Sequence, residues 1–241
     1  SKETVDLIAI SAFAKPNRTA IKPSLSVLIS SPKDLYLRKG TALEIYYQLP
    51  DSFKNERAEY VDLFRKNETL IPWFPSVLIG DDYSAAVEFL LQVQPRLIVT
   101  NNTGIAYEAF QKGINWISGP YLNVTNSFSL LCLKENFNCS GAFISNEISQ
   151  IQIRQLNKPA GFKLYYSIYH PIVLMTIRQC LFHQVSGCGK DQIDDACIMS
   201  CEKSSSITNL KDEKIYLEKS KGNYHRIFNE ENFLNSDIVT D

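Results

Sequence analysis

Residues 97–118 read LIVTNNTGIAYEAFQKGINWIS and combine two strand-like runs with a helix between them. Leu97–Thr100 is short, apolar and rich in β-branched side chains, which is typical of a buried strand. Ile105–Gln111 carries apolar residues at helical spacing, and Gly113 follows it as a helix-ending residue. Asn115–Ser118 is strand-like again. A strand, a helix and a second strand joined by short loops predict a right-handed βαβ unit with parallel strands.

The same alternation continues along most of the chain, with strands roughly 20 to 25 residues apart. The predicted strands are 25–29, 43–47, 70–79, 97–100, 115–118, 142–144 and 163–168, and the predicted helices are 52–66, 83–93, 105–111, 126–133 and 149–156. This order leaves a doubly wound sheet or a (β/α) barrel. No Gly-x-Gly-x-x-Gly motif follows a strand, so a dinucleotide-binding sheet has no positive support.

Polar residues follow several of the predicted strands at the point where each strand ends. They are Asn101, Asn123 with Asn126, and Asn146 with Glu147. In a (β/α) barrel these positions form the catalytic mouth. We therefore expect an α/β fold, namely a TIM-like (β/α) barrel that is partial or complete.

Composition narrows the class of protein. The chain has 241 residues, of which 44% are hydrophobic and 21% charged, so it can bury a core. A net charge of −1 argues against strong electrostatic binding of duplex nucleic acid. It is still compatible with RNA recognition by a local basic patch. No apolar run is long enough to cross a membrane, and no signal peptide is evident, so we expect a cytoplasmic protein without a membrane partner. The start at Ser1-Lys2-Glu3 suggests a C-terminal piece of a longer chain.

The character of the sequence changes near Thr176. We expect residues 1–175 to form the barrel-like domain and residues 176–241 a cysteine-bearing extension that packs on the barrel. The extension also contains basic residues that would give it a positive face for phosphate groups. They are Lys203, Lys211, Lys214, Lys219, Lys221 and Arg226. A solvated surface without a partner is the alternative explanation of these side chains.

Four of the six cysteines lie close together, in the pattern Cys-x7-Cys-x8-Cys-x3-Cys. They are Cys180, Cys188, Cys197 and Cys201. Soft thiolate ligands that converge on one centre suit a zinc ion or an iron–sulfur cluster. Structural zinc sites favour Cys-x2-Cys pairs, which this stretch lacks, so the spacing favours a cluster over zinc, disulfides or free thiols. His183 and His225 are close enough in sequence to compete as ligands, whereas Cys132 and Cys139 receive no function.

Several segments, taken in order, resemble the U32 family of collagenase-like peptidases. They are Leu122–Ser127, Ser145–Ile148 and Pro171–Met175 running into Arg178-Gln179-Cys180. The resemblance implies a TIM-like barrel with a [4Fe–4S] cluster at its edge. It further implies oxygen-independent hydroxylation, of a pyrimidine in tRNA or rRNA or of a ubiquinone precursor, with prephenate as the oxygen source in the RNA-acting members.

One segment departs from the family pattern. Many relatives carry their last cluster cysteine well downstream, where this chain reads Asn223-Tyr224-His225-Arg226. Either Cys188 or His225 would then complete the ligand set, and we favour Cys188. The ligands of the cluster, or of zinc as the alternative, would be Cys180, Cys188, Cys197 and Cys201.

The resemblance also suggests roles for residues at the barrel mouth. Glu147 would accept or orient a proton, Arg178 would contact a small carboxylate co-substrate or a phosphate, and His170 would face the mouth as a third catalytic residue. Asn101, Asn123 and Asn126 would bind substrate. Each of these residues also has a purely structural explanation. Glu147 would stabilise the helix dipole, and the asparagines would cap helices. Arg178 would form a surface ion pair, and His170 would pack in the core. Tyr165, Tyr166 and Tyr169 would stack a base or pack in the core.

Two rival functions remain. A U32 peptidase would need an activated nucleophile or a metal-bound water, yet the chain has three histidines and neither Gly-x-Ser-x-Gly nor His-Glu-x-x-His. In the second rival function the chain is not catalytic. The metal would only stabilise the structure of the extension, and the chemistry would belong to another part of a larger enzyme. The sequence does not decide the substrate, the electron donor or the oligomeric state.

Overall fold

The computed structural model describes residues 23–38, 43–186, 188–194, 197, 201–219 and 224–235. The chain divides into two compact units, Ser1–Ser167 and Ile168–Asp241. The division falls before the boundary expected at 175/176, because Tyr169–Ile177 forms a strand, β8, that pairs with β11 (His225–Leu234). The expected packing of the extension on the barrel stays a prediction.

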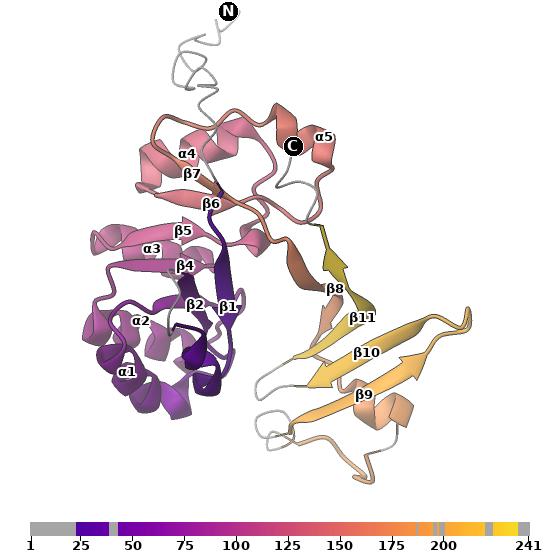
Figure 1. Ribbon diagram of the computed structural model, residues 1–241. Helices are drawn as coiled ribbons and strands as arrows, with labels where there is room; N and C mark the ends of the chain where they lie inside the picture. Colours follow the sequence, from indigo (N-terminus) through magenta and orange to yellow (C-terminus); the bar gives the residue numbers. More distant parts are fainter. Residues whose placement is uncertain are drawn as a thin grey trace, which may run out of the picture. The chain divides into compact units, whose positions relative to one another are not determined.

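The first unit is built on seven parallel strands in sequential order, and it has the α/β architecture of a partial TIM-like barrel (Figure 1). The strands are β1 (Ser26–Ile29), β2 (Glu44–Gln48), β3 (Ile71–Phe74), β4 (Leu97–Thr100), β5 (Asn115–Ser118), β6 (Gly141–Phe143) and β7 (Lys163–Tyr165). Each strand pairs in parallel with the next one along the chain. The expected fold class is confirmed.

Helices connect most of these strands. They are α1 (Arg57–Lys66), α2 (Asp81–Val93), α3 (Thr103–Gln111), α4 (Ser127–Phe137) and α5 (Gln150–Gln155), with short 3₁₀ segments η2 (Pro32–Arg38), η3 (Lys54–Glu56) and η4 (Pro120–Leu122). The side chains of Asn102, Asn126 and Ser149 cap α3, α4 and α5 by accepting backbone N–H groups of the first turn. The strand expected over 70–79 is shorter, since Pro75 directly follows Phe74 and has no N–H for the ladder.

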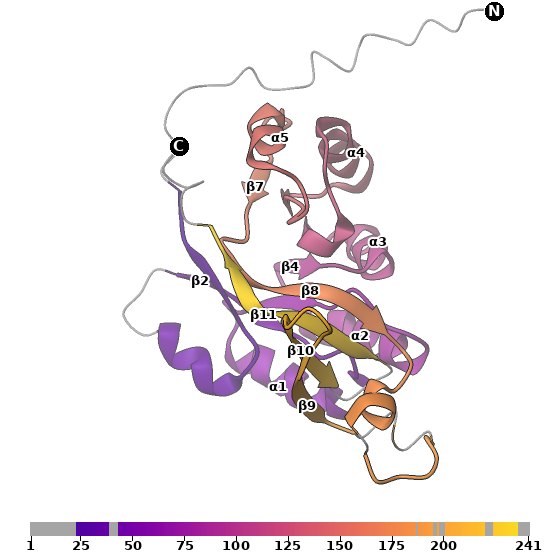
Figure 2. The same ribbon diagram turned by 90° about the vertical axis from the view of Figure 1, so that its right-hand side faces the viewer.

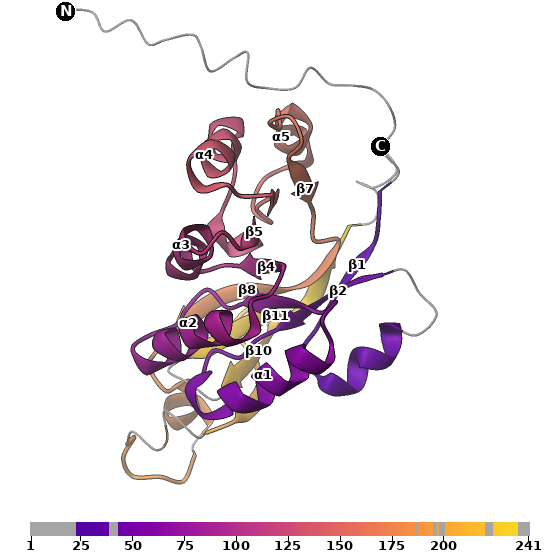
Figure 3. The ribbon, with the colours of Figure 1, turned by 90° about the vertical axis from the view of Figure 1, so that its left-hand side faces the viewer.

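The two faces of the sheet bury different side chains. The helix-covered face carries aliphatic and aromatic residues such as Phe74, Ile98 and Trp116, which pack against Phe89 and Leu130 of the helices. Complete burial of a side chain of this size contributes roughly 1.5–3 kcal/mol. Figure 3 shows α1, α2 and α3 stacked along this face.

The opposite face of the same sheet carries an aromatic cluster. Trp73 and Phe143 meet edge to face with ring centroids 4.9 Å apart, and Phe143 stacks on Tyr165 at 5.0 Å. Tyr46 joins them from β2, with its hydroxyl donating to a carboxylate oxygen of Glu44 at 2.6 Å. Tyr165 thus packs among aromatic side chains of the sheet, which is the core-packing alternative considered for it.

The second unit is a four-stranded antiparallel sheet in the order β8-β11-β10-β9 (Figure 2). Its remaining strands are β9 (Lys203–Thr208) and β10 (Lys214–Lys219), and a short π-helix, η5 (Phe182–Ser186), follows β8. Phe182, Leu217 and Ile227 form its small core. The four clustered cysteines all belong to the connection between β8 and β9. No helix within the described part of either unit has the length and apolarity required to cross a bilayer.

Candidate functional site

Asn101 follows β4 and is held inside the first unit. Its amide nitrogen donates to the carbonyl oxygen of Phe74 at 3.3 Å, and its amide oxygen accepts the N–H of Tyr121 at 3.0 Å. Gly119 lies against it so closely that an added Cβ would come within 2.2 Å of the amide oxygen. The side chain is 5% exposed. Asn101 therefore ties β3, β4 and η4 together, and both ends of its amide are engaged within the fold.

Asn123 and Ser145 connect the segments that follow β5 and β6. The Ser145 hydroxyl donates to the Asn123 amide oxygen at 2.6 Å, and the Glu147 N–H donates to the same hydroxyl at 3.2 Å. Asn123 has the left-handed backbone conformation, with φ of 56°, which asparagine tolerates better than most residues. The Glu147 side chain is exposed to solvent in the turn that leads to α5. Asn123 and Glu147 are thus brought to one edge of the sheet through Ser145.

Asn126 has a structural task at the start of α4. Its side-chain oxygen accepts the N–H of Ser129 at 2.9 Å, which is the capping role considered as its alternative. Capping uses the amide oxygen and leaves the rest of the exposed side chain at the surface. Substrate binding by Asn126 stays a prediction.

Three polar side-chain atoms of the described residues are buried without a hydrogen-bond partner: Ser118 Oγ, Asn146 Oδ1 and His225 Nδ1. Ser118 ends β5, and Asn146 follows β6, so both belong to the strand-end region of the first unit. An unpaired buried polar atom costs about 1–3 kcal/mol. Neither Ser118 nor Ser145 was predicted from the sequence as a site residue. A serine at the end of an apolar strand, as at Ser118, or just after one, as at Ser145, was a usable signal.

His170 and Arg178 belong to the second unit. The His170 ring lies 4.8 Å from the ring of Phe233, its neighbour in the register of β8 and β11. Arg178 directly follows β8, is exposed, and lies two positions before Cys180. Glu147 and the three asparagines lie in the first unit, so the predicted catalytic residues are divided between the two units.

The four clustered cysteines are free and half-buried. Cys180 packs against the core of the second unit, beside Phe182. The N–H of Cys197 donates to a carboxylate oxygen of Asp194 at 2.6 Å, and the N–H of Cys201 donates to the carbonyl oxygen of Cys197 at 3.3 Å. Cys197 and Cys201 are therefore linked by one turn of backbone.

Two lysines lie beside these cysteines. Lys190 Nζ donates to Cys197 Sγ at 3.0 Å, and the contact with Cys197, supported by Asp194 and Cys188, raises the pKa of Lys190. Lys190 thus places a cationic hydrogen-bond donor on the sulfur of Cys197.

Lys219 is the second lysine, and its side chain is 3% exposed. Burial lowers the pKa of Lys219, while the electrostatic interaction with Cys201 and Cys180 acts in the opposite direction. His225 lies opposite Lys219 in the register of β10 and β11 and is also 3% exposed. Burial, and then the charge of Lys219, lower the pKa of His225. One of the four cysteines, Cys197, thus contacts Lys190 directly, and Cys180 and Cys201 interact electrostatically with Lys219.

The donor chemistry fits a soft metal centre, since four thiols without disulfide bonds lie in one connection and are flanked by cationic groups. The orphaned Nδ1 of His225 is a further buried donor or acceptor next to this region. As placed, however, no three His, Cys, Asp or Glu side chains of the described residues form a metal-ligand group. His183 is engaged elsewhere, with Nε2 3.0 Å from the carbonyl oxygen of Lys190.

The expected positive face of the extension needs correction at Lys219, because this side chain is buried. Lys214 is exposed and pairs with Glu230 at 3.5 Å, and burial lowers the pKa of Arg226. Lys203 and Lys211 are exposed, and Lys221 lies outside the described residues. The alternation of β10 explains the error, because Lys219 shares a face with the core residue Leu217.

No protein-family model, no curated protein and no solved structure matches the chain.

Proposed function

We propose that the chain is a U32-family protein that holds a [4Fe–4S] cluster and takes part in the oxygen-independent hydroxylation of a pyrimidine in tRNA or rRNA, in the cytoplasm. The observation that carries the proposal is the set of four free, half-buried thiols in the β8–β9 connection, one of which, Cys197, accepts a hydrogen bond from Lys190. Cys180, Cys188, Cys197 and Cys201 would hold the cluster. When bound, it would supply one-electron redox chemistry.

The residues around the thiols have separate tasks in this proposal. Lys190 donates a hydrogen bond to the sulfur of Cys197. Lys219 contributes a positive charge near Cys180 and Cys201 from the buried face of β10. Both lysines would therefore place a cationic group beside the sulfurs proposed to ligate iron.

At the strand ends of the first unit, Glu147 would accept a proton, because its carboxylate is exposed to solvent and its backbone is fixed by Ser145. Asn123 would offer its amide nitrogen to the substrate while its oxygen accepts from Ser145. Arg178, exposed beside Cys180, would bind a small carboxylate co-substrate such as prephenate, or an RNA phosphate. Asn101 and Asn126 would bind substrate, and His170 would act with Glu147 and Arg178, each in addition to the contacts that it makes in the fold.

The peptidase alternative, if it used a cysteine nucleophile, would require a thiolate activated by a histidine. The described contacts of the histidines are with other groups: His170 with Phe233, His183 with a backbone carbonyl, and His225 with Phe182. The same four thiols would also bind zinc. The second unit would then be a non-catalytic unit that a structural zinc ion stabilises.

Two measurements test the proposal. Protein produced and purified without oxygen should be coloured and contain about four irons per chain, and deletion of the full gene should remove one hydroxylated pyrimidine from tRNA or rRNA hydrolysates analysed by mass spectrometry. Colourless protein with one zinc would overturn the cluster. Unchanged nucleosides, together with lost cleavage of a peptide substrate, would favour the peptidase.

A further inference from the structure

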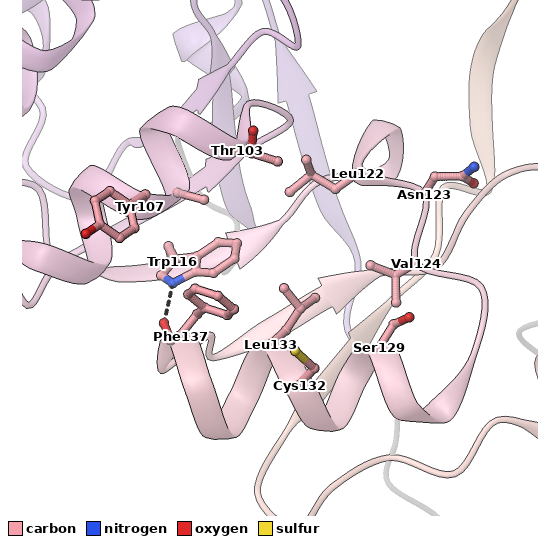
Figure 4. Close-up of a pocket in the computed structure, with 11 residues that line it drawn as sticks. Thr103, Tyr107, Trp116, Leu122, Asn123, Val124, Ser129, Cys132, Leu133 and Phe137 are labelled. Carbon is pink, nitrogen blue, oxygen red and sulfur yellow. Dashed lines mark hydrogen bonds between the residues drawn. The ribbon is translucent and has the colours of Figure 1, made fainter.

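A second site candidate lies in the first unit, on the helix-covered side of the sheet. A pocket of about 350 Å³ opens between α3 and α4, with Trp116 of β5 as its floor (Figure 4). Its walls are mainly apolar and include the rings of Tyr107 and Phe137 and the aliphatic side chain of Leu133. None of these four side chains belongs to the cluster or RNA chemistry proposed above.

The aromatic end of the pocket is held in a fixed shape. Trp116 Nε1 donates to the carbonyl oxygen of Phe137 at 2.9 Å, which fixes the indole orientation. The Phe137 ring packs edge to face on Phe110, with centroids 5.8 Å apart. The helix that carries Phe137 is capped at both ends, by the side chain of Asn126 and by the left-handed Asn138. A ligand would therefore meet a preformed wall and would not have to order it.

The lining also indicates the chemistry of the ligand. None of the eleven residues that line the pocket is charged. Figure 4 shows Tyr107, Trp116 and Phe137 at one end, while the polar side chains of Ser129 and Asn123 lie toward the other. A charged ligand would lose its hydration without gaining a partner of opposite charge. An uncharged molecule with an apolar ring and one polar substituent matches both ends.

Exposure and volume support a ligand of this class. Tyr107 is 52% exposed and Phe137 is 37% exposed, so apolar ring surface at the aromatic end faces solvent. Covering such surface contributes about 25 cal/mol per Å². A cavity of roughly 150 Å³ is enough to bind benzene, and this pocket is larger than that, so two fused rings fit.

We propose that the pocket between α3 and α4 binds an uncharged aromatic molecule of one or two fused rings that carries a hydroxyl or carbonyl group. The rings lie against Trp116 and Phe137, and the polar substituent points toward Ser129. This binding does not use the residues proposed to hold the cluster, because Trp116, Phe137 and Ser129 belong to β5 and α4 of the first unit. It shares with the proposed function only Asn123, which lies toward the polar end of the pocket.

The test uses 2-naphthol as the probe and full-length protein labelled with 5-fluorotryptophan. The chain has two tryptophans, so the fluorine NMR spectrum has two resonances, which Trp116→Phe assigns. Trp73 lies on the opposite face of the sheet and serves as an internal control. We expect 2-naphthol to shift the Trp116 resonance in a saturable way and to leave the Trp73 resonance in place. The charged analogue 2-naphthalenesulfonate should produce no saturable shift.

Variants that fill the pocket provide the second measurement. Ala106→Leu and Ser129→Leu add volume from α3 and from α4, and each should abolish the Trp116 shift in protein whose circular dichroism is unchanged. Phe128→Ala is the matched control, since Phe128 is 62% exposed on α4 and does not line the pocket. This control should bind 2-naphthol as the wild type does. No Trp116 shift at the solubility limit, or a shift that survives in a folded filling variant, overturns the proposal; equal binding of the sulfonate overturns its uncharged class.

Discussion

Lys219 and His225 lie directly opposite one another on β10 and β11, and both side chains are buried. Two groups that can each carry a positive charge are thus placed side by side in the small sheet of the second unit. Lys203 stands on the other side of Lys219 in the same register, and the Phe182 ring lies 5.8 Å from that of His225. Protonation of His225 is therefore opposed both by burial and by a neighbouring cation.

This arrangement predicts a pH dependence of the second unit. The pKa of His225 is lowered from 6.5 in the fold, so the unfolded state binds more protons between that lowered pKa and about pH 6.5. The stabilisation by neutral His225 is complete above this window and is lost as the pH falls through it. Amide hydrogen exchange of β10 and β11 should accelerate from pH 7.5 to 5 after correction for intrinsic rates. His225→Gln should flatten this dependence, and an unchanged slope in that variant would contradict the assignment.

The ligand set of the proposed cluster can be tested one thiol at a time. Serine at Cys180, Cys188, Cys197 or Cys201 should each remove most of the bound iron, because a cubane needs all four ligands. Cys132→Ser is the control, since Cys132 lies on α4 in the first unit. Iron analysis of protein prepared without oxygen gives the result. Full iron in Cys188→Ser together with loss in His225→Ala would show that His225 is the fourth ligand.

Asn101 should matter for stability whether or not it touches substrate. Asn101→Ala leaves the Phe74 carbonyl and the Tyr121 N–H without their partner, so the free energy of unfolding should fall by about 1–3 kcal/mol. Urea denaturation followed by tryptophan fluorescence measures this change, because both tryptophans lie in the first unit. Asn115→Ala, at an exposed position of β5, should stay within about 0.5 kcal/mol of the wild type. Equal stabilities of the two variants would show that the Asn101 hydrogen bonds contribute little.

Glu147 and Arg178 provide the functional test. Glu147→Gln and Arg178→Ala should abolish the RNA modification in cells and leave the iron content unchanged, because the exposed side chains of both residues lie outside the proposed ligand set. Glu135→Gln, a matched change of an exposed carboxylate on α4, should leave the modification intact. If both variants supported full modification, the proposed roles of Glu147 and Arg178 would be wrong.

The βαβ pattern around residues 97–118 predicted the first unit well, because short apolar runs and capped helices are local signals. Strands β4 and β5 have the predicted bounds. The capping of α4 by Asn126 was also foreseeable, as an asparagine before a helix usually caps it. The role of Asn101 was not, because its partners Phe74 and Tyr121 are far from it in sequence, and only the folded sheet brings them together.

In the second unit, the prediction that Lys219 lies on an exposed basic face was wrong, because it considered only the neighbouring charged residues in the sequence. Lys219 looked like part of a solvated basic run, but Ile215, Leu217 and Lys219 alternate on one face of β10, and that face is buried. Because every second side chain of a strand points to the same face, the sequence of β10 already indicated that Lys219 shares a face with Leu217. The pairing of β8 with β11 carried no local signal, since most of the unit separates these strands along the chain.

The strand order also limits when each strand can pair while the chain is being synthesised. In the first unit each strand pairs with its immediate successor, so pairing can proceed one βα step at a time as the polypeptide emerges. In the second unit β11 lies between β8 and β10, although it is made last. Cys180 and Cys201 consequently leave the ribosome before the sheet that flanks them can close. Cys180 would therefore gain its packing against the core that includes Ile227 only after His225–Leu234 has been added.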